Sequence, residues 1–115
     1  MGKQLSPYDT AHELARSILN SEVYGKYVTA KREVESNPEF KEQIVKLRTL
    51  QMELDRAQLT GQDLPPDKLI MVRAELARMA TINEISSFLD AEGKFIQLFN
   101  DIQGIIQKAI EDGFR

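Results

Sequence analysis

The sequence predicts an all-α protein, an elongated bundle of about five helices that associates with itself and contains two long amphipathic helices. Three observations predict this class. Apolar residues recur at steps of three and four along most of the 115 residues, helix caps followed by proline open two segments, and no segment alternates apolar and polar residues as a strand does. The length predicts a single domain over residues 1–115, with residues 1–5 as a flexible start.

The first three helices are predicted from their caps and breaks. Ser6–Pro7 combines an N-cap with a first-turn proline and opens a helix that ends near Asn20. A second helix follows and runs to about Val34. Asn37–Pro38 repeats the cap-and-proline pair and opens a helix that runs to about residue 59, where Gly61 stops it.

This third helix is the first of the two long amphipathic helices. Its apolar stripe recurs with heptad spacing and consists of Phe40, Ile44, Leu47, Leu50, Leu54 and Ala57. Such a stripe needs other helices to cover it.

The remaining elements are a loop and two further helices. Two prolines stiffen the loop 61–66, and Pro66–Asp67 then starts a helix that runs to about Met79. Thr81 and Glu84 have the spacing of a capping box, in which each side chain bonds the other residue's backbone N–H. They predict that the last helix begins there and spans residues 82–112.

The last helix carries a heptad-spaced apolar seam that consists of Ile85, Phe88, Phe95, Phe99, Ile102, Ile106 and Ala109, and Leu89 and Ile96 widen this seam by one row. At about 1.5 Å per residue this helix is roughly 46 Å long, whereas a globule of this chain length is roughly 34 Å across. We therefore expect an elongated molecule or a helix that packs against another copy or another protein.

Glu92 fills the one gap in this seam, and it has two interpretations. It sets the register of the helices by pairing with an arginine such as Arg73 or Arg78, or the seam is exposed to water at that point. The second interpretation is favoured, because an isolated buried carboxylate is costly.

Composition excludes several classes of function. The formal net charge is -3 without a basic stripe, so we expect no direct contact with nucleic acid. The absence of cysteine excludes disulfides, thiolate metal sites and thiol catalysis, and it agrees with a cytoplasmic location. No apolar run approaches the roughly 20 residues of a membrane span, so we expect no membrane contact.

The sequence predicts no enzyme, cofactor or metal. His12 is the only histidine, and Arg16 stands where a zinc-protease helix would place the second one. A lone imidazole cannot build a three-ligand zinc site, and no serine has a base and an orienting group beside it. The glycines are scattered rather than clustered before a helix, which argues against a phosphate-binding loop.

The order of these features resembles the YlbF/YmcA-type competence-regulator family of small helical bacterial proteins. The similar stretches are residues 11–15 with Ile18, 21–24, 37–40, 47–58 before Gly61, and 88–92 with Phe95. Two departures stand out: Ala80–Thr81 replaces an Asn-Pro that relatives often carry, and the cysteines of cluster-binding relatives are missing. Iron–sulfur binding is therefore not carried over.

The resemblance implies an all-helical protein that self-associates and acts through protein contacts without catalysis. Some members of this family join related proteins in a complex that influences sporulation, competence and biofilm formation and is linked to ribonuclease Y and messenger RNA processing.

The sequence therefore predicts a non-enzymatic cytoplasmic regulator or adaptor that forms homodimers or higher oligomers. Other regulatory proteins of the same family or a ribonuclease complex are further partners that the resemblance suggests. The alternative is a holdase-like chaperone or a structural coiled-coil spacer. The residues predicted to form the contact with a second copy or a partner are Leu47, Leu50, Leu54, Phe88, Phe95, Phe99 and Ile102.

Overall fold

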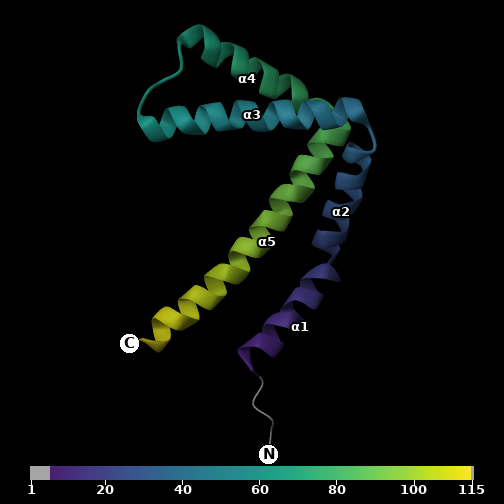
Figure 1. Ribbon diagram of the computed structural model, residues 1–115, viewed down its shortest axis with the longest axis vertical. Coiled ribbons are helices and arrows are strands. Elements are labelled where there is room, and N and C mark those ends of the chain that lie inside the picture. Colours follow the sequence, from purple (N-terminus) through teal and green to yellow (C-terminus); the bar gives the residue numbers. More distant parts are fainter. Residues whose placement is uncertain (1–5, 115) are drawn as a thin grey trace, which may run out of the picture. The chain divides into compact units, whose positions relative to one another are not determined.

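A computed structural model describes residues 6–114, and this part of the chain contains helices and no strand. The helices are α1 (Pro7–Leu19), α2 (Glu22–Glu35), α3 (Pro38–Thr60), α4 (Pro66–Ala80) and α5 (Asn83–Gly113), shown in Figure 1. The predicted all-α class is confirmed, as are the two long amphipathic helices, α3 with 23 residues and α5 with 31. The predicted flexible start, residues 1–5, lies outside the described residues.

The predicted caps of α1 and α3 are confirmed. The Ser6 hydroxyl accepts a hydrogen bond from the backbone N–H of Tyr8 at 3.1 Å. The Asn37 side chain accepts from the backbone N–H of Glu39 at 3.0 Å. Gly61 ends α3 in the left-handed region at φ 69°, a conformation that glycine adopts without a Cβ clash.

The junction between α4 and α5 differs from the predicted capping box. The Thr81 hydroxyl donates to the backbone carbonyl of Arg78 at 2.6 Å, and the Thr81 backbone N–H also bonds to the end of α4. Thr81 therefore closes α4, and α5 begins two residues later at Asn83. The difference arises because a threonine hydroxyl has both an O–H donor and an acceptor oxygen, so the same side chain is able to serve either helix end.

The chain forms two compact units. We call Ala30–Asp90 the hairpin unit; it holds the end of α2, all of α3 and α4, and the start of α5. We call the described residues on either side of it the terminal unit, which comprises α1, the start of α2 and the rest of α5.

The hairpin unit has an apolar core. Within it, α3 and α4 run in opposite directions and are joined by the loop after Gly61 (Figure 1). The buried residues are Ala30, Val34, Leu47, Val72, Met79, Ile85 and Phe88. Met79 and Ile85 are completely enclosed, so one side of the end of α4 and of the start of α5 faces the interior of this unit.

The terminal unit lacks a comparable core. Ala91 is the only buried residue among those described in this unit. Its best-packed contact is aromatic: the Phe95 ring of α5 stacks on Tyr27 of α2 at 5.1 Å between centroids and lies 5.6 Å from the Tyr24 ring. Much of the apolar surface of this unit therefore remains in contact with water.

Within residues 6–114, none of the helices combines the length and the apolar character that crossing a bilayer requires.

Candidate functional site

The most prominent surface feature is an uncovered apolar stripe on the second half of α5. We call it the open face, and it consists of Ile96, Phe99, Gln103, Ile106 and Ile110. Its four apolar members are 48–62% exposed: Phe99 48%, Ile96 and Ile106 50%, and Ile110 62%. The steps of four and three between successive members place all five on one side of the helix.

The open face continues the helix whose first turns are buried. Ile85 is 0% exposed and Phe88 is 5% exposed, whereas every residue from Gln103 to Phe114 is exposed. One regular apolar pattern thus has a covered part and an uncovered part. A contiguous exposed apolar patch of this kind is typical of a protein interaction site.

The charged residues of this part of α5 lie away from the open face. Lys94, Asp101 and Lys108 follow one another at steps of seven, and at 100° per residue they fall on the opposite side of the helix. The residues that flank the stripe on one side, Asn100 and Gln107, are uncharged. Gln107 donates to Glu111 at 3.3 Å, so a partner that covers the open face meets this carboxylate at its edge and has no charged group of this stretch to bury at its centre.

The seven predicted contact residues differ in exposure, since two are buried, four are half-buried and one is exposed. Leu47 and Phe88 are buried inside the hairpin unit, and Phe99 is exposed on the open face. The half-buried members are Leu50, Leu54, Phe95 and Ile102. Their role in a contact with a second copy stays a prediction, and Phe99 is the member that offers the most surface to a partner.

Sequence reasoning placed Ile96 one row beside the seam and missed two members of the open face, Gln103 and Ile110. Ile110 lies on the same row as Ile96, and Gln103 is polar. The signal that could have found them is their own heptad spacing, since Ile96, Gln103 and Ile110 are seven residues apart. The aromatic contacts of Phe95 on the neighbouring row explain why the open side is shifted from the predicted seam.

A second apolar stripe lies on α3 but is interrupted. Val45, Met52 and Leu59 are 61%, 63% and 88% exposed and stand seven residues apart. Thr49 and Arg56 occupy the intervening positions of the same side, so the apolar residues do not adjoin. This stripe is a weaker candidate than the open face of α5.

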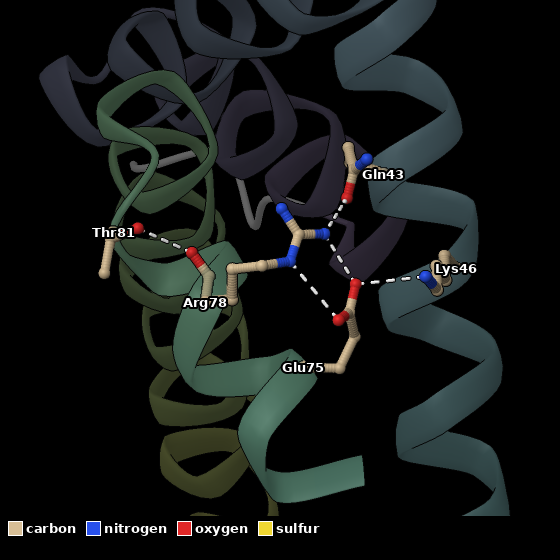
Figure 2. A network of polar contacts seen from close by, with 5 residues as sticks. All are labelled: Gln43, Lys46, Glu75, Arg78 and Thr81. Carbon is tan, nitrogen blue, oxygen red and sulfur yellow. Dashed lines mark hydrogen bonds and ion pairs between the residues drawn. The ribbon is translucent and has the colours of Figure 1, made fainter. Parts of the chain in front are cut away.

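A polar network joins α3 to α4 within the hairpin unit (Figure 2). The Glu75 carboxylate of α4 accepts a hydrogen bond from Lys46 Nζ of α3 at 3.0 Å and from the Nε of Arg78 at 3.2 Å. Arg78 also donates to the side-chain oxygen of Gln43 at 3.0 Å. The hydrogen bond from Arg78, followed by that from Lys46, lowers the pKa of Glu75 from 4.5 to about 2.

This network bears on the prediction for Glu92. Arg78, one of the two arginines named as its candidate partners, donates to Glu75 and Gln43. Glu92 itself is half-buried. Its exposure therefore does not decide between the two interpretations, a register-setting ion pair and a point where water reaches the seam. The network also gives a structural reason for the lowered pKa of Glu75, whose carboxylate links α4 to α3.

The one histidine that the sequence analysis considered as a zinc ligand lies on the surface. His12 is exposed on α1. Among residues 6–114, no group of three or more histidine, cysteine, aspartate or glutamate side chains is placed to hold a metal ion.

Comparison with known proteins identifies a family to which the chain is similar over most of its length. The sequence profile of the family described as "Control of competence regulator ComK, YlbF/YmcA" matches residues 8–111. A UPF0342 protein of Halothermothrix orenii is 33% identical over 107 residues, which cover 92% of this chain and 90% of that protein. A UPF0342 protein of Bacillus licheniformis is 26% identical over 105 residues, which cover 91% and 90%.

Two solved structures share the fold. A protein of unknown function (DUF964) from Bacillus stearothermophilus has a TM-score of 0.76 at 19% identity, with coverage of 94% of this chain and 95% of that one. Bacillus subtilis RicA in complex with RicF has a TM-score of 0.63 at 17% identity, with coverage of 94% and 96%. The chain, matched over nearly its whole length, therefore belongs to the YlbF/YmcA family of proteins described as controlling the competence regulator ComK.

Proposed function

We propose that this protein is a non-enzymatic regulator or adaptor that acts in the cytoplasm through protein–protein contacts. The observation that carries the proposal is the open face of α5, an apolar stripe over residues 96–110 with Asp101 and Lys108 on the opposite side of the helix. Protein interaction surfaces bury apolar side chains at their centre and keep charged groups at the rim. The open face fits this description, because its exposed members are mostly apolar.

The comparisons support a partner of the same family. RicA, whose fold this chain shares, has been crystallised in complex with RicF, and the family description concerns regulation. We propose that the partners are a second copy, other regulatory proteins of the family or a ribonuclease complex. The process they serve is developmental control (competence, sporulation or biofilm formation) or ribonuclease-linked RNA processing.

The absence of catalysis is part of this proposal. It is supported by the position of Glu75, whose lowered pKa would otherwise mark a candidate catalytic group. Lys46 and Arg78 hold this carboxylate in a link between α3 and α4, which is a structural use of the perturbed group.

Affinity capture from the source cell tests the proposal. The wild-type chain should retain a small, defined set of proteins that includes family members or ribonuclease components, and Phe99→Asp should lose them because it places a charge in the open face. Ile105→Asp is the matched control, since Ile105 is 69% exposed on the same helix outside the open face. Equal capture by wild type and Phe99→Asp would show that the open face is not the contact.

The same surface also favours one alternative, a holdase-like chaperone, because exposed apolar side chains bind unfolded chains. A holdase would retain many unrelated proteins and suppress the aggregation of a heated client protein. An adaptor should do neither, so light scattering of a heated client in the presence of the protein separates the two functions.

A further inference from the structure

We propose that the outer side of α3 is a second contact surface, which binds an acidic amphipathic helix of a partner protein. We call this surface the outer face, and it consists of Lys41, Val45, Thr49, Met52, Arg56 and Leu59. The inference rests on the proposed function, because an adaptor needs one surface for each of the proteins that it joins. It assigns to the hairpin unit a contact separate from the open face of α5, which belongs to the terminal unit.

The outer face is a side of α3 that α4 does not cover. At 100° per residue its six members fall within an arc of about 80°, and all six are exposed. The side chains of Gln43, Lys46 and Glu53, which bond to residues of α4, fall outside this arc. A partner is therefore able to lie along the outer face without displacing the contacts between α3 and α4.

The centre of the outer face is apolar. Val45, Met52 and Leu59 are more than half exposed and stand seven residues apart. The Thr49 hydroxyl donates to the backbone carbonyl of Val45 at 3.1 Å, so this side chain offers mainly its methyl group to a partner. The hydrocarbon part of an arginine such as Arg56 covers apolar surface while its guanidinium stays in water. A helix with heptad-spaced apolar residues therefore finds matching side chains along about 21 Å of α3.

The charges of the outer face are both positive. The acidic residues of α3 fall outside the arc; they are Glu39, Glu42, Glu53 and Asp55. Within residues 6–114, neither Lys41 nor Arg56 forms an ion pair. By contrast, Lys46 on the side that bonds to α4 is paired with Glu75. The outer face is thus a basic surface on a chain whose formal net charge is -3.

These two cations select an acidic helix as the partner. Carboxylates beside the apolar seam of such a helix would pair with Lys41 and Arg56, whereas a basic segment would meet like charges. The two positions are separated by about 22 Å along the helix axis, so the matching carboxylates stand about four turns apart. A nucleic acid fits less well, because its phosphates would leave the apolar centre uncovered.

Two synthetic peptides test the proposal on the full-length chain. Each forms a helix of about 18 residues with leucine at heptad spacing, and the residues beside the first and last leucines are glutamate in one peptide and lysine in the other. In fluorescence anisotropy at low salt, the glutamate peptide should bind about tenfold more tightly or better, and salt should reduce the difference. Equal binding of the two peptides, or no binding of the glutamate peptide, overturns the proposal.

Charge reversal on the protein tests the two cations. Lys41→Glu combined with Arg56→Glu should reverse the preference, so that the lysine peptide binds more tightly than the glutamate peptide. A purely structural role of these side chains would weaken both peptides alike. Lys26→Glu combined with Lys108→Glu is the matched control, since it changes the net charge equally at exposed positions outside the outer face. A preference that both double variants keep overturns the proposal.

Met52→Asp tests the apolar centre of the face. It should weaken the glutamate peptide about tenfold or more, because it places a carboxylate in the seam. Met71→Asp is the matched control, since Met71 is 71% exposed on α4, and it should bind like the wild type. Circular dichroism checks that both variants keep their helices. Equal affinities of the two variants contradict a contact through Met52.

Further measurements identify a wrong occupant. A single-stranded RNA oligonucleotide that binds the wild type and is lost from Arg56→Glu, while the glutamate peptide is not, would assign the face to nucleic acid. A change in self-association on sedimentation of Arg56→Glu would assign it to a second copy. Either result overturns the proposal.

The outcomes also separate this inference from the proposed function. A chain that captures defined proteins through Phe99 but does not bind the glutamate peptide overturns only the acidic partner of the outer face. A chain that binds the peptide through the outer face but captures no defined protein through Phe99 overturns only the open face as a contact.

Discussion

At the scale of single residues, the glycines separate into one that the backbone requires and others that it does not. Gly61 has φ 69°, whereas Gly93 and Gly104 lie inside α5 with helical backbone. A Cβ built on Gly104 meets no atom within 4 Å. The same substitution should therefore have opposite effects at Gly61 and Gly104.

We expect Gly104→Ala to stabilise the protein by about 0.5–1 kcal/mol, because alanine loses less backbone entropy than glycine when it joins a helix. Gly61→Ala should destabilise it by about 1–2 kcal/mol, the cost of a side chain in the left-handed region. Urea denaturation of the two variants measures both effects. A loss of stability in Gly104→Ala would mean that a surface present in solution covers this position.

The buried and exposed leucines of α3 give a second comparison at this scale. Leu47 is 3% exposed and Leu59 is 88% exposed on the same helix. Leu47→Ala should cost about 2–5 kcal/mol, from lost transfer free energy and the cavity left behind. Leu59→Ala should change the free energy of unfolding by less than about 0.5 kcal/mol. Chemical denaturation of both variants tests whether Leu47 belongs to the core, and similar values for the two would contradict its burial.

At the scale of elements, the α3–α4 hairpin depends on pH through Glu75. Its pKa is about 2 in the folded protein and 4.5 as the ordinary value of a glutamate. A carboxyl whose pKa is lowered by folding contributes stability that is fully present above its unfolded pKa and is lost as the pH falls through its folded pKa. The contribution of Glu75 is therefore present above pH 4.5 and is lost between about pH 4.5 and pH 2.

Denaturation of the wild type and of Glu75→Gln across this pH range measures the contribution. The difference in stability between the two proteins should shrink as the pH falls from 4.5 to 2, because protonation removes the charge that the variant already lacks. Glu53→Gln is a useful control, since Glu53 also pairs across the hairpin, with Lys68 at 3.5 Å. A difference that stays constant with pH would contradict the lowered pKa of Glu75.

The five helices themselves follow from signals that act over a few residues. The caps at Ser6 and Asn37 and the left-handed Gly61 lie where the sequence predicts them. Thr81 is the exception, because its hydroxyl bonds to Arg78 in the helix before it rather than to Glu84 in the helix after it. Both partners lie three residues from Thr81, so spacing alone does not choose between them.

At the scale of the whole molecule, the proposed pairing of copies couples stability to concentration. If a second copy binds only the folded chain, the unfolding temperature rises with protein concentration above the dissociation constant. For a dimer of this size we expect about 2–4 °C per tenfold increase.

Differential scanning fluorimetry of the wild type over two decades of concentration measures this rise. Phe99→Asp should remove the concentration dependence, because the charge would be buried without a partner in the contact. A midpoint that does not change with concentration in the wild type contradicts self-association in the range examined.

The sequence by itself determined the helices, most of their ends and the family, because caps, apolar periodicity and hydrogen bonds between close neighbours depend on the local order of residues. It also placed Phe99 in an apolar seam. Only the tertiary structure decided that Ile85 and Phe88 are enclosed while Phe99 and Ile106 remain exposed, and that Arg78 pairs with Glu75. The physical reason is that periodicity states which side of a helix is apolar, whereas burial and pairing depend on which distant segment lies opposite that side.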